Sequence, residues 1–220
     1  MEKRSVLARI EEVGIIPVVR VESGDQAIAV AEVIRDAGIP ILEITMTVPD
    51  AVKVIEKLSN CYGDEVLIGA GTVLNPETAS SCINAGAQFV VGPVLNLQTV
   101  ELCKNHSIAV FPGGLTPTEV FSAWEAGADA VKIFPCNAVG GAKYLRALKA
   151  PLPQINLIPT GGVSLSTASD LIAAGALALG VGSELANMEA IKAGDFGTVA
   201  ANARSYVAAV RKARGVESVD

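Results

Sequence analysis

The chain has 220 residues and a formal net charge of −6, and 50% of its residues are hydrophobic although only 4% are aromatic. This length fits one large domain, and a core of Ala, Val, Ile and Leu suits parallel strands that are covered on both faces. The lysines and arginines are scattered, which argues against a nucleic acid or an anionic membrane as partner.

A phrase that joins the end of a helix to an apolar strand recurs along the chain. It reads DAGIPILEI at 36–44, NAGAQFVV at 84–91, EAGADAVKI at 125–133 and AAGALALGV at 173–181. The glycine of each copy is expected to end its helix in the left-handed conformation, and a tight loop then leads into the strand.

The remaining segments keep the same rhythm behind an amphipathic helix in MEKRSVLARIEEVG. Strands are predicted at 15–20, 42–46, 66–72, 89–93, 108–112, 130–135, 156–160 and 178–182. Helices are predicted at 25–37, 50–59, 76–85, 97–105, 117–126, 141–149, 167–174 and 197–213. This alternation predicts an α/β fold, a single (β/α)8 TIM barrel over 1–220 with an extra N-terminal helix. An open doubly wound sheet is the alternative, but VVRVESGDQA after the first strand is not its usual phosphate fingerprint.

The four cysteines show no metal-binding pattern. Cys61, Cys82, Cys103 and Cys136 form no CxxC pair, and the single histidine, His106, has no companion ligand nearby. The sequence therefore predicts reduced thiols and no metal. We find neither a signal peptide nor an apolar stretch of membrane-spanning length, so a cytoplasmic protein without a membrane partner is expected.

Lys132 is the one lysine of nine that falls inside an apolar strand, Ala130-Val131-Lys132-Ile133-Phe134. Because side chains alternate along a strand, Lys132 is expected to point into the barrel together with Phe134. A buried ammonium is costly unless it is paired or neutral, and the neutral amine is the nucleophile of Schiff-base enzymes. The structural alternative is a strand-end lysine that reaches out to solvent or forms a salt bridge.

Glu43 is a negatively charged residue that is also expected at an inward position of a strand. In Leu42-Glu43-Ile44-Thr45, the apolar residues are expected to face the helices, which leaves Glu43 and Thr45 facing inward. A carboxylate at this position can pair with Lys132 and act as a general acid and base, although it can also be only the counter-ion of a structural pair.

Two glycine-rich turns predict an anion site. Gly161 and Gly162 follow the seventh strand, and Gly182 and Ser183 follow the eighth. Phosphate sites of these barrels are often built from the loops after these two strands. Turns without a ligand are the alternative.

Arg20 ends the first strand, where it can bind an anion or remain an exposed charge.

Four motifs occur together in a specific order: LEIT at 42–45, GAGTV at 69–73, KIFP at 132–135 and PTGGV at 159–163. With them the chain, from about residue 5 to 212, resembles the class I aldolases for 2-dehydro-3-deoxy-6-phosphogluconate (KDPG), which also act on 4-hydroxy-2-oxoglutarate (KHG). The resemblance implies a lyase of the Entner–Doudoroff pathway, typically a homotrimer, that uses no metal or other cofactor.

The resemblance also assigns roles residue by residue. Lys132 forms the Schiff base, and Glu43 is the acid and base. The remaining implied contacts with the 2-oxo acid sugar phosphate are, for substrate, Arg20, Thr72, Pro93, Phe134 and Thr160, and, for its phosphate, Gly161, Gly162, Gly182 and Ser183.

Two positions depart from the common family pattern. Thr47 stands where some members have an arginine, and Gly92 precedes Pro93 where many have serine. Thr160 favours the gluconate substrate, because a sister family for the galactonate epimer has an apolar residue there. The galactonate epimer, an unphosphorylated 2-oxo acid and a non-catalytic sugar-phosphate-binding barrel stay open as alternatives.

Overall fold

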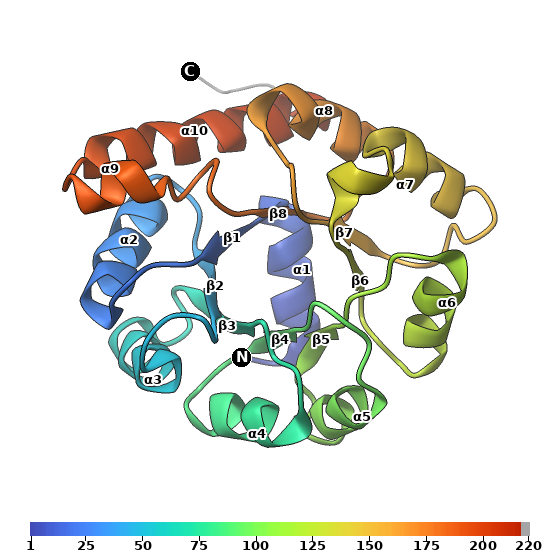
Figure 1. Ribbon diagram of the computed structural model, residues 1–220, viewed down its shortest axis with the longest axis horizontal. Helices are drawn as coiled ribbons and strands as arrows, with labels where there is room; N and C mark the ends of the chain where they lie inside the picture. Colours follow the sequence, from blue (N-terminus) through green and yellow to red (C-terminus); the bar gives the residue numbers. More distant parts are fainter. Residues whose placement is uncertain (217–220) are drawn as a thin grey trace.

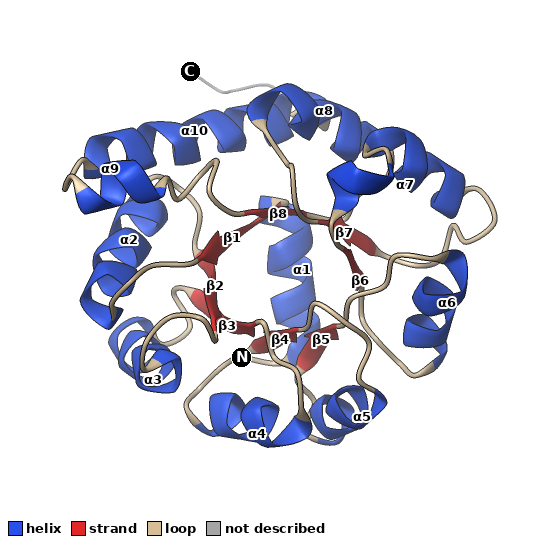
Figure 2. Ribbon diagram, viewed as in Figure 1, coloured by secondary structure: helices blue, strands red, loops and turns tan. Residues whose placement is uncertain are grey.

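The computed structural model describes residues 1–216, in which parallel strands form a ring surrounded by helices (Figures 1 and 2). The strands are β1 Ile15–Val19, β2 Ile41–Thr45, β3 Leu67–Gly71, β4 Phe89–Val91, β5 Ala109–Phe111, β6 Val131–Ile133, β7 Leu157–Pro159 and β8 Leu179–Val181. The helices are α1 Lys3–Val13, α2 Gly24–Asp36, α3 Ala51–Tyr62, α4 Pro76–Asn84, α5 Leu97–Asn105, α6 Pro117–Glu125, α7 Ala142–Lys149, α8 Leu165–Ala173, α9 Met188–Lys192 and α10 Phe196–Ala213. A 3₁₀ helix, η1, spans Cys136–Val139.

Every strand and helix expected from the sequence is present, but several strands are shorter than predicted. The segments predicted at 89–93, 108–112 and 130–135 each pair over only three residues. Each predicted segment ends in a proline, which has no N–H to donate to a ladder. Two elements were not predicted, η1 and α9, because four or five residues are too few to show helical periodicity.

The hydrogen-bonded ladder is not continuous around the ring, in contrast to the predicted closed barrel. One sheet has the order β5-β4-β3-β2-β1-β8, and a second contains β6 and β7. Isolated parallel bridges lie at the two junctions: Gly113 with Lys132 on one side, and Leu157 with Ala176 and Thr160 with Gly180 on the other. The structure is therefore an α/β fold of parallel strands in two ladders. One isolated bridge joins the β5–β6 junction, and two isolated bridges join β7 to the β8 segment.

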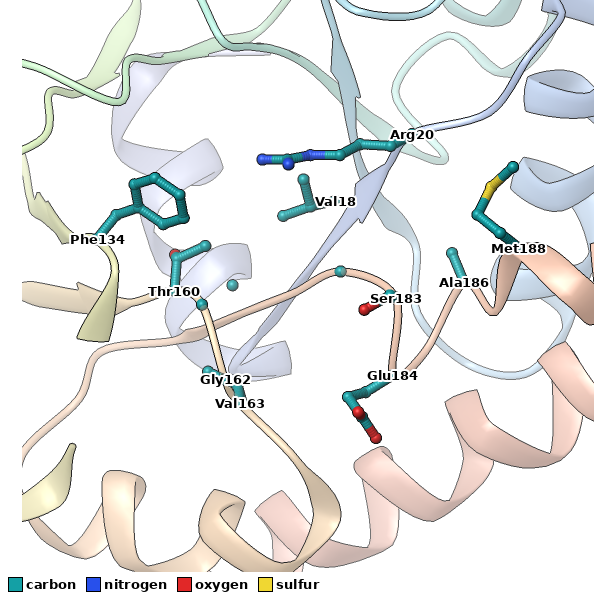
Figure 3. A pocket seen from close by; sticks show the side chains of 13 residues that line it. Val18, Arg20, Phe134, Thr160, Gly162, Val163, Ser183, Glu184, Ala186 and Met188 are labelled. Atoms are coloured by element: carbon teal, nitrogen blue, oxygen red, sulfur yellow. The ribbon is translucent and has the colours of Figure 1, made fainter. Parts of the chain in front are cut away.

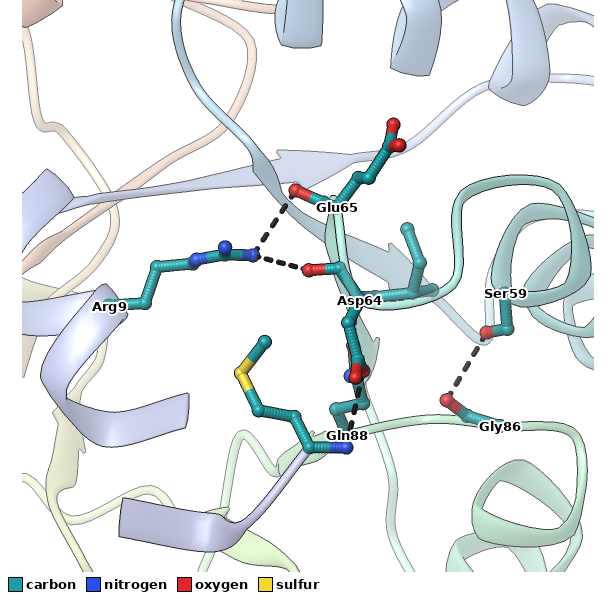
Figure 4. A network of polar contacts seen from close by, with 8 residues as sticks. Arg9, Ser59, Asp64, Glu65, Gly86 and Gln88 are labelled. Atoms are coloured by element: carbon teal, nitrogen blue, oxygen red, sulfur yellow. Dashed lines mark hydrogen bonds and ion pairs between the residues drawn. The ribbon is translucent and has the colours of Figure 1, made fainter. Parts of the chain in front are cut away.

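Helix α1 lies across one end of the ring (Figure 1). The Arg9 guanidinium donates to the carbonyls of Asp64, at 2.8 Å, and Glu65, at 3.1 Å, just before β3 (Figure 4). Just after α10, the Arg214 guanidinium donates to the carbonyl of Glu11 near the end of α1 at 2.6 Å. Because these contacts are made by segments that precede strands, α1 covers the amino-terminal end and leaves the carboxyl-terminal end of the ring to the site.

The four recurring glycines adopt the expected conformation, with φ of 97°, 99°, 99° and 94° at Gly38, Gly86, Gly127 and Gly175. Among the residues that the structure describes, we find no helix with the length and apolar character needed to cross a membrane.

Candidate active site

Lys132 on β6 and Glu43 on β2 face each other inside the ring. Each residue is 2% exposed, and Lys132 Nζ lies 3.7 Å from Glu43 Oε1. Glu43 Oε1 has no hydrogen-bond partner among residues 1–216. Buried charges without full hydrogen bonding are unfavourable for stability, so this pair is better suited to chemistry than to holding the fold together. The inward direction predicted for both side chains is confirmed.

Phe134 lies next to this pair on the same face of the chain. Lys132 Nζ is 5.6 Å from the centroid of the Phe134 ring, within the range of a cation–π contact. Phe134 is half-buried and also lines the cavity above the pair. It therefore connects the buried amine to the open part of the site.

A cavity of about 290 Å³ opens between β1 and the turns that follow β7 and β8 (Figure 3). Seven residues predicted for the site line it: Arg20, Phe134, Thr160, Gly161, Gly162, Gly182 and Ser183. Six further lining residues were not predicted: Val18, Val163, Gly180, Glu184, Ala186 and Met188. Most of these are small or apolar and show no chemical pattern in the sequence. Glu184 is an acidic residue directly after Ser183, and this position next to a predicted site residue was the only sequence feature that could have indicated it.

The turn after β7 has the shape that a backbone anion site needs. Gly161 and Gly162 have φ of 86° and 70°, which L side chains rarely adopt. The turn leads directly into α8, whose first turn is capped by a bond from Ser164 N–H to Thr167 Oγ1 at 2.9 Å. Exposed N–H groups at a glycine turn and a helix start are suited to binding a phosphate.

Gly180 on β8 makes room for Thr160. A Cβ at residue 180 would lie 3.0 Å from the Cβ of Thr160 and closer still to its hydroxyl oxygen. Thr160 is buried, and its hydroxyl donates to the Ile158 carbonyl at 3.4 Å. Thr160 therefore lies in the wall between the cavity and the interior of the ring.

Arg20 is exposed at the end of β1 and extends over the cavity towards Phe134 (Figure 3). Arg20 is one of the lining residues, and its role in binding an anion stays a prediction. The carboxylate of Glu184 points away from Arg20 in the same view. The cavity therefore combines one arginine, a serine hydroxyl and glycine turns, which favours an anionic group.

Thr72 and Pro93, also predicted to contact substrate, lie outside the lining of this cavity. They follow β3, which pairs with β2 in the sheet, and β4, which pairs with β3 on its other side. Thr72 has φ of 60°. A β-branched residue in this region is strained, and such strain is concentrated at functional sites. Thr72 therefore lies at the end of the strand that pairs with the strand of Glu43, and it does not line the cavity at the phosphate turns.

Thr47, at the position that departs from the family pattern, bonds within its own strand end. Its hydroxyl oxygen is 2.6 Å from that of Thr45. Thr45 in turn donates to the Val19 carbonyl at 3.0 Å, just before Arg20. These short side chains connect the ends of β1 and β2, and they supply no cation for a substrate carboxylate.

The residues to which no role was assigned lie away from the Lys132–Glu43 pair or are inert. Burial raises the pKa of the Cys136 thiol to about 11, so this cysteine is a poor nucleophile. His106 ends α5, where a ring nitrogen lies 2.9 Å from the Leu102 carbonyl. Within 1–216, His, Cys, Asp and Glu side chains form no group of three that could hold a metal ion.

Comparison with known proteins identifies close relatives. Residues 6–202 match the family model for KDPG and KHG aldolase. The chain is 35% identical to the 2-dehydro-3-deoxy-phosphogluconate aldolase of Treponema pallidum, covering 90% of this chain and 93% of that protein. It is 38% identical to the 2-dehydro-3-deoxy-6-phosphogalactonate aldolase of Escherichia coli, covering 78% and 83%.

Solved structures of similar proteins have the same fold as this chain. The KDPG aldolase of Legionella pneumophila, with pyruvate captured as a covalent carbinolamine intermediate, superposes with a TM-score of 0.84 at 30% identity, covering 91% of this chain and 97% of that one. A cube-shaped protein cage, designed by fusing symmetric oligomeric domains, superposes with a TM-score of 0.85 at 35% identity, covering 93% and 74%.

Proposed function

Because this chain belongs to the KDPG and KHG aldolase family, a family of carbon–carbon lyases, we propose that it cleaves KDPG to pyruvate and glyceraldehyde 3-phosphate. The observation that carries the proposal is the buried Lys132–Glu43 pair beside a cavity suited to an anionic group. KHG, which lacks the phosphate, is proposed as a second substrate of the same site.

In the proposed mechanism, the Lys132 amine attacks the C2 ketone and water leaves, which gives an iminium that accepts electrons. Glu43 removes the proton of the C4 hydroxyl, directly or through a water molecule. The C3–C4 bond then breaks, glyceraldehyde 3-phosphate leaves, and its bonding electrons remain on a pyruvate enamine. Protonation at C3 and hydrolysis release pyruvate and restore the Lys132 amine.

The phosphate is proposed to bind at the turns after β7 and β8, through Gly161, Gly162, Gly182 and Ser183, with Arg20 above them. Thr72 and Pro93 are proposed to contact the carboxylate end of the substrate. Since the phosphate is remote from the bond that breaks, the turns are expected to affect KM more than kcat.

A second candidate substrate is the galactonate epimer of KDPG. The 38% identity to the Escherichia coli enzyme for that epimer favours it, whereas the polar Thr160 favours the gluconate form. Rates of cleavage of the two purified epimers would decide between them, because the preferred substrate has the higher kcat/KM.

We infer three further properties at the level of the molecule. The strand–helix units form one domain, a closed (β/α)8 barrel, because bridges span both gaps between the ladders. The protein assembles as a homotrimer, which is supported by its likeness to a cage built from symmetric oligomeric domains. It works in the cytoplasm, where thiols such as those of its four cysteines stay reduced. Its reaction is proposed to need no metal.

The Schiff base is tested by reduction with borohydride in the presence of pyruvate, followed by intact-mass measurement and peptide mapping. We expect one pyruvyl adduct on Lys132 and none in a folded Lys132→Ala variant. Treatment with EDTA is expected to leave turnover unchanged. A folded wild-type protein that forms no adduct would remove the Schiff-base mechanism.

A further inference from the structure

The carboxylate of Glu43 is not held in place by hydrogen bonds to its Oε1 atom. That oxygen is buried and has no hydrogen-bond partner among residues 1–216. Its charged neighbour, Lys132 Nζ, is 3.7 Å away, which is beyond hydrogen-bond distance. A general base must be fixed relative to the proton that it removes, so another feature of the site has to restrict this side chain.

The neighbouring strand offers such a feature. Strands β2 and β3 pair in parallel, with Glu43 opposite Gly69 and Thr45 opposite Gly71. Because side chains alternate, Gly69 and Gly71 both present their missing side chains to the interior of the ring, on the face that Glu43 occupies. The interior side of β3 is therefore open at two successive inward positions.

These two openings are filled differently. A Cβ at Gly69 would collide with the ring of Phe89 from β4, so that space is already occupied. A Cβ at Gly71 would lie 2.6 Å from both the Cγ and the carboxyl carbon of Glu43, and closer still to Oε1. With Phe89 over Gly69, the Glu43 side chain extends along β3 until its carboxylate lies over Gly71.

We propose that Gly71 is a positioning residue for Glu43, and that the absence of a side chain at residue 71 sets where the acid and base group lies relative to Lys132. This inference rests on the proposed aldolase function. Gly71 acts only through Glu43, because any side chain at residue 71 must displace the carboxylate. Gly71 also precedes the strained Thr72, so the end of β3 has little freedom to move aside.

The test combines Gly71→Ala, Glu43→Asp and the double variant, with Gly197→Ala as a matched control. A Cβ at Gly197 in α10 meets only Asp195 Oδ1, at 3.4 Å. We expect Gly71→Ala to lower kcat for KDPG cleavage on the order of 100-fold, the scale of general acid–base catalysis, while KM changes less than about threefold. Gly197→Ala should match the wild type.

The double variant separates positioning from general damage. Aspartate is one methylene shorter, so it makes room for the alanine, and the two losses in kcat should not multiply. End-point trapping of pyruvate on Lys132 should remain complete in all variants. Multiplying losses, or a Gly71→Ala variant that fails to trap pyruvate while Glu43→Asp succeeds, would overturn the proposal.

Two further outcomes are also decisive. If Gly71→Ala alone does not fold, a double variant that folds supports the contact with Glu43, and one that does not fold overturns it. If the wild-type protein neither traps pyruvate nor cleaves KDPG, the proposed function itself has failed, which is a result distinct from multiplying losses in active variants.

Discussion

At the scale of single residues, the site depends on what is absent as much as on what is present. Three glycines on strands face larger inward side chains: Gly69 admits Phe89, Gly71 admits Glu43 and Gly180 admits Thr160. Interiors are packed tightly enough that one extra carbon at any of these positions requires a neighbour to move. Small residues on one strand therefore determine where the functional groups of the next strand can lie.

Thr72 gives a prediction in which stability and activity change in opposite directions. Its φ of 60° is unfavourable for a β-branched residue, whereas asparagine adopts this conformation more readily. We expect Thr72→Asn to raise the free energy of unfolding by about 1 kcal/mol and to lower kcat/KM for KDPG. Urea unfolding and steady-state kinetics measure the two effects. A variant that loses stability would show that Thr72 is not strained.

At the scale of elements, α6 begins with a capping box at the end of the loop after β5. Glu119 Oε2 accepts from the N–H groups of Thr116 and Leu115, each at 2.8 Å, and Thr116 Oγ1 accepts from Glu119 N–H at 3.3 Å. The backbone N–H of Thr116, then that of Leu115, then the Thr116 side chain lower the pKa of the Glu119 carboxyl below its ordinary value.

This lowered pKa predicts how the cap responds to pH. A carboxyl whose folded pKa is depressed contributes stability above its unfolded pKa and loses it as pH falls through the folded pKa. Since Glu119 is exposed, Glu119→Ala should lower the free energy of unfolding by no more than about 1 kcal/mol at neutral pH. The difference from wild type should shrink in acid. Urea unfolding of wild type and Glu119→Ala at neutral and at acidic pH tests this prediction, with Glu125→Ala in the same helix as control. A difference in the free energy of unfolding that is the same at both pH values would contradict it.

Arg214 connects three elements at the end of the ring opposite the site. Its guanidinium donates to the carbonyls of Glu11, at 2.6 Å, Glu12, at 2.9 Å, and Leu177, at 2.9 Å. Partial burial lowers its pKa. Arg214→Met leaves these carbonyls without a donor, so we expect the free energy of unfolding to fall by about 2 kcal/mol, with unchanged kcat. Arg204→Met, at an exposed position within α10, is the control, and an equal loss there would refute the role of the three hydrogen bonds.

Most elements, but not all of the site, could be predicted from the sequence. Lys132 and Glu43 could be predicted because each is a charged residue within an apolar strand segment, at a position that faces inward. Glu184 and Met188 were missed because the loop after β8 and the short α9 have no periodicity. The positions of Gly71 and Phe89 relative to Glu43 depend on the register of three strands, which no local pattern reveals.

At the scale of the whole molecule, exposed apolar side chains suggest where copies of the chain meet. Leu74, Val94 and Leu97 are 53%, 54% and 60% exposed. They lie close together, because Asn96 donates through Nδ2 to the Leu74 carbonyl at 3.2 Å and so ties the start of α5 to the loop after β3. Neighbouring apolar side chains with this exposure mark contact surfaces in many proteins. We therefore expect this group to be buried in the proposed homotrimer.

An aspartate at Leu97 tests this expectation, because a carboxylate buried in an interface without a partner is strongly unfavourable. We expect light scattering coupled to size-exclusion chromatography to give three 22.6 kDa chains for the wild type and mostly one for Leu97→Asp. Leu165→Asp changes an apolar residue that is 45% exposed on α8, across the ring from α5 (Figure 1), and should remain trimeric. If only Leu165→Asp dissociates the protein, the subunit interface lies at α8 instead. A monomeric wild type would refute the proposed homotrimer.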